Sequence, residues 1–86
     1  MNIRPLTTEA SANGSSNAST FGRSMHVRAV NTAASASLVT LVDSDGSTLG
    51  TMSLAASESV ILHKPKNHKY FAANASVLFA GVDYRG

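Results

Sequence analysis

Three histidines are the side chains in this sequence best suited to bind a metal ion or to move a proton. They are His26, His63 and His68, and the sequence contains no cysteine. His63 and His68 flank a proline loop and could approach each other, but no third ligand stands at a spacing typical of a metal site. Because serine is so frequent here, a match to a Ser-His-Asp pattern carries no information. We therefore expect polar surface residues, with no metal and no cofactor.

The acidic stretch Asp43–Gly46 has the residue types of a calcium-binding loop. An EF-hand loop needs glycine at its sixth position and glutamate at its twelfth. Counted from Asp43, the glycine comes fourth and the twelfth residue is Leu54. Asp-Gly between two apolar runs instead predicts a β-hairpin, because glycine accepts a positive φ angle and aspartate tolerates one.

The loop Lys64–Lys69 carries three lysines and a histidine, and Tyr70-Phe71 follows it directly. Cations beside aromatic rings are typical of proteins that bind single-stranded nucleic acids. Two aromatics in a short strand are more often part of a core, and a formal net charge of +2 gives little attraction for phosphates. We expect a solvated loop, or one that faces an acidic neighbour, and no nucleic-acid partner.

Enzyme motifs are missing from the sequence: it has no glycine-rich phosphate loop, no nucleophile elbow and no zinc-protease motif. The five acidic residues show no paired-carboxylate spacing. We predict a protein that is not an enzyme and has no small-molecule substrate. No apolar stretch is long enough for a signal peptide or a membrane span, so we expect no membrane partner.

Short apolar runs separated by turn residues fill the chain from Met25 onward, and none has helical period over ten or more residues. Alternation is clearest in Met25–Val30, where Met25, Val27 and Ala29 share one face. The predicted strands are Met25–Val30, Leu38–Val42, Thr48–Leu54, Ser59–His63, Tyr70–Ala72 and Ser76–Tyr84, with Ala18–Phe21 as a further edge strand. This pattern predicts an all-β fold, a small antiparallel β-sandwich of about 6–7 strands.

The apolar members of these strands form the expected core. They are Met25, Val27, Leu38, Val42, Leu49, Met52, Leu54, Val60, Leu62, Phe71, Val77, Phe79 and Val82. A run such as Leu38–Val42 is apolar on both faces, so its pattern does not say which side chains point inward.

Residues 1–24 differ from the rest because Thr7–Thr20 is almost entirely Thr, Ser, Ala, Asn and Gly. Such a stretch buries too little apolar surface to order itself. We expect two parts: an extended, polar N-terminal arm (1–24) and a β-sandwich domain (25–86). The arm is either a flexible tail or a segment that orders on a neighbouring subunit. Its expected partner-binding anchors are Ile3, Pro5, Leu6 and Phe21.

With 86 residues the chain buries a modest fraction of its surface. Small domains gain stability from disulfides, metals or oligomerisation, and the first two are not expected here. We therefore expect a homo-oligomer or a protein docked on a larger body. Charged residues make up only 14% of the chain, so it could pack against another protein without desolvating many ions.

Five stretches and the opening residues carry a resemblance to a known group of proteins. The stretches are Val27–Thr32, Val39–Asp43, Thr48–Leu54, Glu58–Lys64 and Val77–Tyr84, and the opening is Ile3-Arg-Pro-Leu6 with the Ser/Thr/Ala tract after it. With these residues the sequence resembles small β-sandwich virion accessory proteins of marine tailed bacteriophages, cyanophages among them. The group brings no catalytic residues to transfer.

The resemblance implies a capsid decoration or cement protein that binds capsid subunits, or another virion protein, and stabilises the shell. The protein would be made in the bacterial cytoplasm and reside in the virion, with a trimer as one arrangement. Two alternatives stay open: a small tail or neck component, and a module that binds glycans on its sandwich face. Few aromatics argue against the glycan module, since sugars usually stack on aromatic rings.

Overall fold

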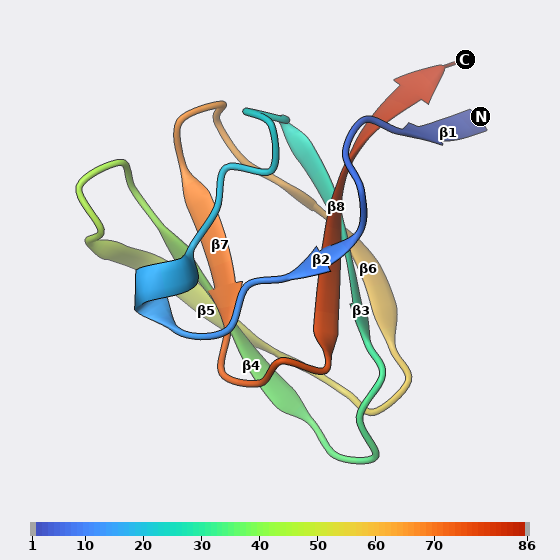
Figure 1. Ribbon diagram of the computed structural model, residues 1–86, viewed down its shortest axis with the longest axis vertical. Helices are drawn as coiled ribbons and strands as arrows, with labels where there is room; N and C mark the ends of the chain where they lie inside the picture. Colours follow the sequence, from blue (N-terminus) through green and yellow to red (C-terminus); the bar gives the residue numbers. More distant parts are fainter. Residues whose placement is uncertain (1, 86) are drawn as a thin grey trace.

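Two antiparallel β-sheets pack face to face (Figure 1). The structure is a computed structural model that describes the backbone of residues 2–85 and the side chains of residues 5–83. Its elements are β1 (Asn2–Pro5), β2 (Ala10–Ser11), the 3-10 turn η1 (Ser15–Asn17), β3 (His26–Asn31), β4 (Ser37–Val42), β5 (Thr48–Leu54), β6 (Ser59–His63), β7 (Lys69–Ala72) and β8 (Val77–Arg85). One sheet has the order β1-β8-β3-β6, with β2 also on β8, and the other has the order β5-β4-β7. The predicted β-sandwich is confirmed.

The β4–β5 hairpin forms at the predicted Asp-Gly turn. The N–H of Gly46 donates to the carbonyl of Asp43 at 3.0 Å, and Gly46 has a φ of 90°. The Oδ1 atom of Asp43 accepts hydrogen bonds from the N–H groups of Asp45 and Ser47, both at 2.9 Å. The carboxylate of Asp43 therefore stabilises the turn, in agreement with a residue spacing that does not match a calcium-binding loop.

Phe79 of β8 lies at the centre of the core. Its ring stacks on Phe21 with centroids 5.0 Å apart and on Tyr70 of the other sheet at 6.4 Å. The Tyr70 hydroxyl donates to the carbonyl of His63 at 2.9 Å, which ties β7 to β6. Small residues fill much of the remaining space: Ala12, Ala29 and Ala72 are all at most 1% exposed.

Part of the expected core is correct and part is wrong. Buried as predicted are Val27, Val42, Leu54, Val77, Phe79 and Val82. Exposed by 40% or more, against the prediction, are Met25, Leu38, Leu49 and Met52. In β4 it is Val39 that points inward, at 2% exposed, so the adjacent Leu38 points out. Leu49 and Met52 lie on β5, a strand whose residues are exposed except for Leu54.

The N-terminal segment does not extend away from the sandwich, and here the structure differs from the expected arm. β1 pairs with β8 from Pro5↔Val82 to Asn2↔Arg85, and β2 pairs with β8 at Ala10↔Phe79 and Ser11↔Leu78. Between them, the N–H of Leu6 donates to the carbonyl of Gly81 at 2.7 Å. β1 and β2 thus occupy one edge of the first sheet (Figure 1).

The same segment then crosses to the second sheet. The N–H of Ala72 donates to the carbonyl of Ala12 at 2.8 Å, and the N–H of Gly14 donates to the carbonyl of Ala72 at 2.9 Å. Ser19 and Tyr70 exchange two backbone hydrogen bonds, at 3.1 and 3.2 Å. The N-terminal segment, defined from here on as residues 2–24, therefore covers the free edges of β8 and β7. The segment is ordered by backbone hydrogen bonds, which do not depend on apolar side chains. Its polar composition therefore wrongly indicated a separate arm.

Gly81 is where the turn at residues 21–24 approaches β8 most closely. A Cβ atom at this position would meet the Ser24 hydroxyl and would lie 2.6 Å from the carbonyl oxygen of Phe21. We predict that Gly81→Ala lowers the free energy of unfolding by about 2 kcal/mol, because the turn must shift. Urea denaturation measures this loss.

Gly50→Ala is the matched control, since a Cβ at Gly50 meets nothing within 4 Å. We expect it to change the free energy of unfolding by less than about 0.5 kcal/mol. Equal losses from the two substitutions would contradict the close approach at Gly81.

Candidate interaction surfaces

Phe21 anchors the N-terminal segment to the core of its own sandwich. The side chain is 7% exposed and stacks on Phe79, and the residue has a φ of 53° in the turn before β3. Ser19 Oγ accepts a hydrogen bond from the N–H of Phe21 at 3.0 Å, which supports this turn. The structure leaves Phe21 unavailable to a partner, because its ring is part of the core.

Two of the other expected anchors lie at the surface. Pro5 is exposed and its backbone lies opposite Val82, while Leu6 is 50% exposed. The backbone of Ile3 pairs with that of Tyr84, and the side chain of Ile3 lies outside the described residues. Leu6 therefore presents a large apolar side chain for contact.

A groove of about 380 Å³ begins at Leu6. It is lined by Leu6, Gly22, Arg23, Ser24, Met25, His26, Lys66, Val82 and Asp83. Leu6 and Met25 are 50% and 45% exposed, so two large apolar side chains stand at its surface. Arg23 and Lys66 add two cations and Asp83 one acid. This Leu6–Met25 groove combines apolar contact area with charge, which suits recognition of a protein surface.

Lys64 holds one wall of this groove in place. Its side chain is fully buried, and Nζ donates to the carbonyl of Ser24 at 2.6 Å and to those of Pro65 and Lys66 at 3.4 Å. Its backbone N–H donates to the carbonyl of Met25 at 2.8 Å. The expectation of a solvated basic loop is thus wrong for Lys64, whose ammonium group is held by backbone carbonyls.

Burial lowers the pKa of Lys64 from its usual value of 10.5. The unfolded chain therefore keeps this proton over a pH range in which the folded protein releases it, so the free energy of unfolding rises with pH there. We predict that the wild type gains stability relative to Lys64→Met as the pH approaches 10.5.

Urea denaturation of both proteins at increasing pH measures that difference. Taking the difference removes the effect of Tyr70, whose pKa is raised by burial and which both proteins share. A difference that stays flat or falls as the pH rises would contradict a buried ammonium group at Lys64.

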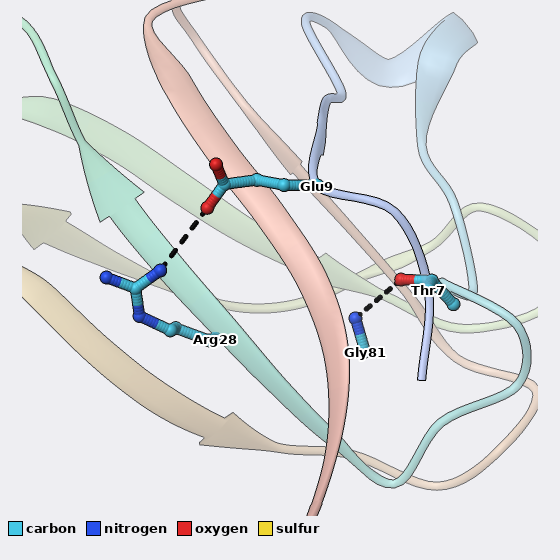
Figure 2. Close-up of polar contacts among 4 residues, drawn as sticks. All are labelled: Thr7, Glu9, Arg28 and Gly81. Atoms are coloured by element: carbon cyan, nitrogen blue, oxygen red, sulfur yellow. Dashed lines mark hydrogen bonds and ion pairs between the residues drawn. The ribbon is translucent and has the colours of Figure 1, made fainter. Parts of the chain in front are cut away.

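Figure 2 shows two polar contacts that hold the N-terminal segment beside β8. The Oγ1 atom of Thr7 accepts a hydrogen bond from the N–H of Gly81 at 2.8 Å, at the point where β1 has ended and β2 has not begun. Glu9 reaches Arg28 of β3 at 3.3 Å, and both side chains are more than 40% exposed. An exposed ion pair adds little stability, so the hydrogen bond of Thr7 matters more.

Thr7→Val keeps the shape of the side chain but leaves the N–H of Gly81 without its acceptor. We predict a loss of about 1–2 kcal/mol in the free energy of unfolding. For Glu9→Gln, which weakens the exposed pair, we expect less than about 0.5 kcal/mol. Thermal or urea denaturation compares the two, and a larger loss for Glu9→Gln would reverse this ranking of the contacts.

The histidines that the structure brings together are His26 and His63, which face each other in the β3–β6 register with ring centroids 5.2 Å apart. His68 lies in the loop before β7, and its Nδ1 atom is buried with no hydrogen-bond partner among the residues that the structure describes. Within residues 2–85, no three His, Cys, Asp or Glu side chains form a group able to hold a metal ion. The same residues contain no helix with the length and apolar character needed to cross a bilayer.

No known protein family, curated protein or solved structure matches this chain. The resemblance to phage virion proteins therefore stays a prediction. Met25 was expected in the core but lies at the surface, and Lys64 was expected in a solvated loop but is buried. Met25 precedes β3 by one residue, so the alternation that buries Val27 and Ala29 does not extend to it. No local signal marks Lys64, because its main acceptor, Ser24, is 40 residues away.

Proposed function

We propose that this protein is a structural component of a tailed-phage virion, a decoration or cement protein that binds capsid subunits and stabilises the shell. The observation that carries the proposal is the Leu6–Met25 groove, where two large apolar side chains are exposed. The N-terminal segment beside the groove is held on the sandwich by backbone hydrogen bonds. The resemblance over most of the strands supports it. The action is binding, with no covalent change.

The groove is held in shape by backbone hydrogen bonds on both sides. The N–H of Leu6 donates to Gly81, and the carbonyl of Met25 accepts from Lys64. Because these segments are already ordered, binding costs little backbone entropy, unlike the ordering of a flexible arm at roughly 1–2 kcal/mol per residue. The proposed mechanism is therefore docking of a preformed surface, in place of an arm that folds onto its neighbour.

The chemistry of the groove indicates its partner. Burial of Leu6 and Met25 favours an apolar contact, and the neighbouring Arg23 and Lys66 favour carboxylates beside it. The proposed partner is thus a capsid or other virion protein with an apolar patch flanked by acidic residues. Many copies on one particle would strengthen a weak single contact through multivalency.

The location of the protein is tested on purified particles. We expect quantitative mass spectrometry to find the chain at a fixed ratio to the major capsid protein, and antibody labelling to decorate the head. Labelling confined to the tail or neck would reject capsid decoration, and absence of the chain from particles would reject a virion protein.

The role of the groove is tested with shells assembled without this protein. We predict that Leu6→Asp combined with Met25→Asp weakens shell binding at least about tenfold, because buried carboxylates would replace apolar contacts. Leu38→Asp is the matched control, since Leu38 is 44% exposed but lies on β4 of the other sheet. Shell binding that survives the double substitution, or is lost equally in the control, would contradict the proposed docking site.

A further inference from the structure

β5 is an open strand edge at one side of the sandwich. Among residues 2–85 it pairs only with β4, and in the order β5-β4-β7 it forms the outer strand of its sheet (Figure 1). Six of its seven residues are exposed. The β-bulge lies at its hairpin end, opposite Leu41 and Val42, so pairing is regular from Gly50 to Leu54. Such an edge presents unpaired N–H and C=O groups that another strand can bind.

The flanking residues set β5 apart from β6, an edge strand of the first sheet. No charged residue occurs between Gly46 and Ser57, so the whole of β5 is uncharged. β6 likewise contains no Asp, Glu, Lys or Arg, but Pro65 stands two residues after it, and a proline beside an edge strand limits further pairing. An uncharged strand can lie beside an identical strand with no like-charge repulsion and no ion to desolvate.

A hollow of about 190 Å³ accompanies this edge. It is lined by Val39, Leu41, Gly50, Thr51, Met52 and Tyr70. Met52 is 40% exposed, while a Cβ at Gly50, two residues earlier, would meet nothing within 4 Å. β5 therefore carries both a projecting apolar side chain and an empty position on the same face.

We propose that two copies of this chain associate through their β5 strands, paired antiparallel about a two-fold axis at Thr51. This is the register in which all seven residues of Thr48–Leu54 have a partner. Directly opposed residues of antiparallel strands share a face, so Met52 of each copy lies over Gly50 of the other. There it fills the hollow between Leu41 and Tyr70.

The result is a continuous six-stranded sheet, β7-β4-β5 followed by β5-β4-β7 of the second copy. A seven-residue strand is about 23 Å long, and its edge buries less than the roughly 800 Å² per partner of a standard interface. The dimer is accordingly concentration-dependent in solution. This two-fold pairing takes the place of the trimer expected from the resemblance, and it does not depend on the proposed capsid role.

Cysteine crosslinking tests the register, because the sequence has no cysteine of its own. Opposed Cα atoms lie about 4.5–5.5 Å apart in an antiparallel pair, so Thr51→Cys is within disulfide reach of itself across the two-fold axis. In the same register the two copies of residue 53 lie about 13 Å apart. Thr51→Cys should therefore form the disulfide-linked dimer at least about tenfold faster than the matched variant Ser53→Cys.

Sedimentation equilibrium of the intact protein tests the contact itself. A Cβ atom at Gly50 meets nothing within 4 Å in the monomer and valine favours a strand, so Gly50→Val adds methyl groups where Met52 of the second copy would lie. We expect it to raise the dimer dissociation constant at least about tenfold without loss of stability. Leu38→Asp, on the central strand β4 and 44% exposed, should leave the dimer intact.

Three results would overturn the proposal: a wild-type protein that stays monomeric at all concentrations, equal crosslinking at positions 51 and 53, or an unchanged dimer in Gly50→Val. Because these measurements use the purified chain alone, their failure leaves the capsid proposal untouched. A failure of shell binding likewise leaves the dimer untouched.

Discussion

Pairing of the N-terminal segment with both sheets is the constraint on which the rest of this structure depends. Residues 2–24 supply a partner strand to β8 and backbone hydrogen bonds to β7, so one segment closes a whole side of the sandwich. Phe21 fixes the segment to the core through its stacked contact with Phe79. A chain of 86 residues without cysteine has no disulfide to hold the two sheets together, so this non-covalent pairing takes that role.

This closure makes the two sides of the molecule different. On the closed side, Leu6 and Met25 are held at the rim of a groove by backbone hydrogen bonds, and Lys64 joins the loop after β6 to the turn at Ser24. On the other side, β5 keeps an unpaired and uncharged edge. A surface suited to docking and an edge suited to strand pairing thus lie on different sheets, so the two contacts are independent of each other.

The parts of this fold that the sequence predicts well depend on interactions between residues that are close in the sequence. The Asp-Gly turn at Asp43–Gly46 is visible because both its hydrogen bonds and its positive φ angle involve neighbouring residues. β5 and β6 begin and end where the apolar runs do. Leu38 and Val39 show the limit of such signals. Both are apolar, and only the position of the second sheet decides that Val39 points inward.

The candidate sites were less predictable, because they depend on contacts between residues far apart in the sequence. Backbone hydrogen bonds order the N-terminal segment, and such bonds do not require particular side chains. The sequence pattern therefore does not identify Ala12 as a core residue. Phe21 was expected to anchor a partner, but its ring is buried in the core of its own chain. Leu6 was expected at a partner contact, and its exposure is compatible with that role.

Native-state amide hydrogen exchange tests the closure of the sandwich most directly. We predict that the amides of Gly14, Ser19, Tyr70 and Ala72, which pair the N-terminal segment with β7, exchange as slowly as amides of the central strand β3. Exchange of Gly14 and Ser19 at the rate of an unstructured peptide, with β3 still protected, would show that the segment is a free arm and would contradict the account.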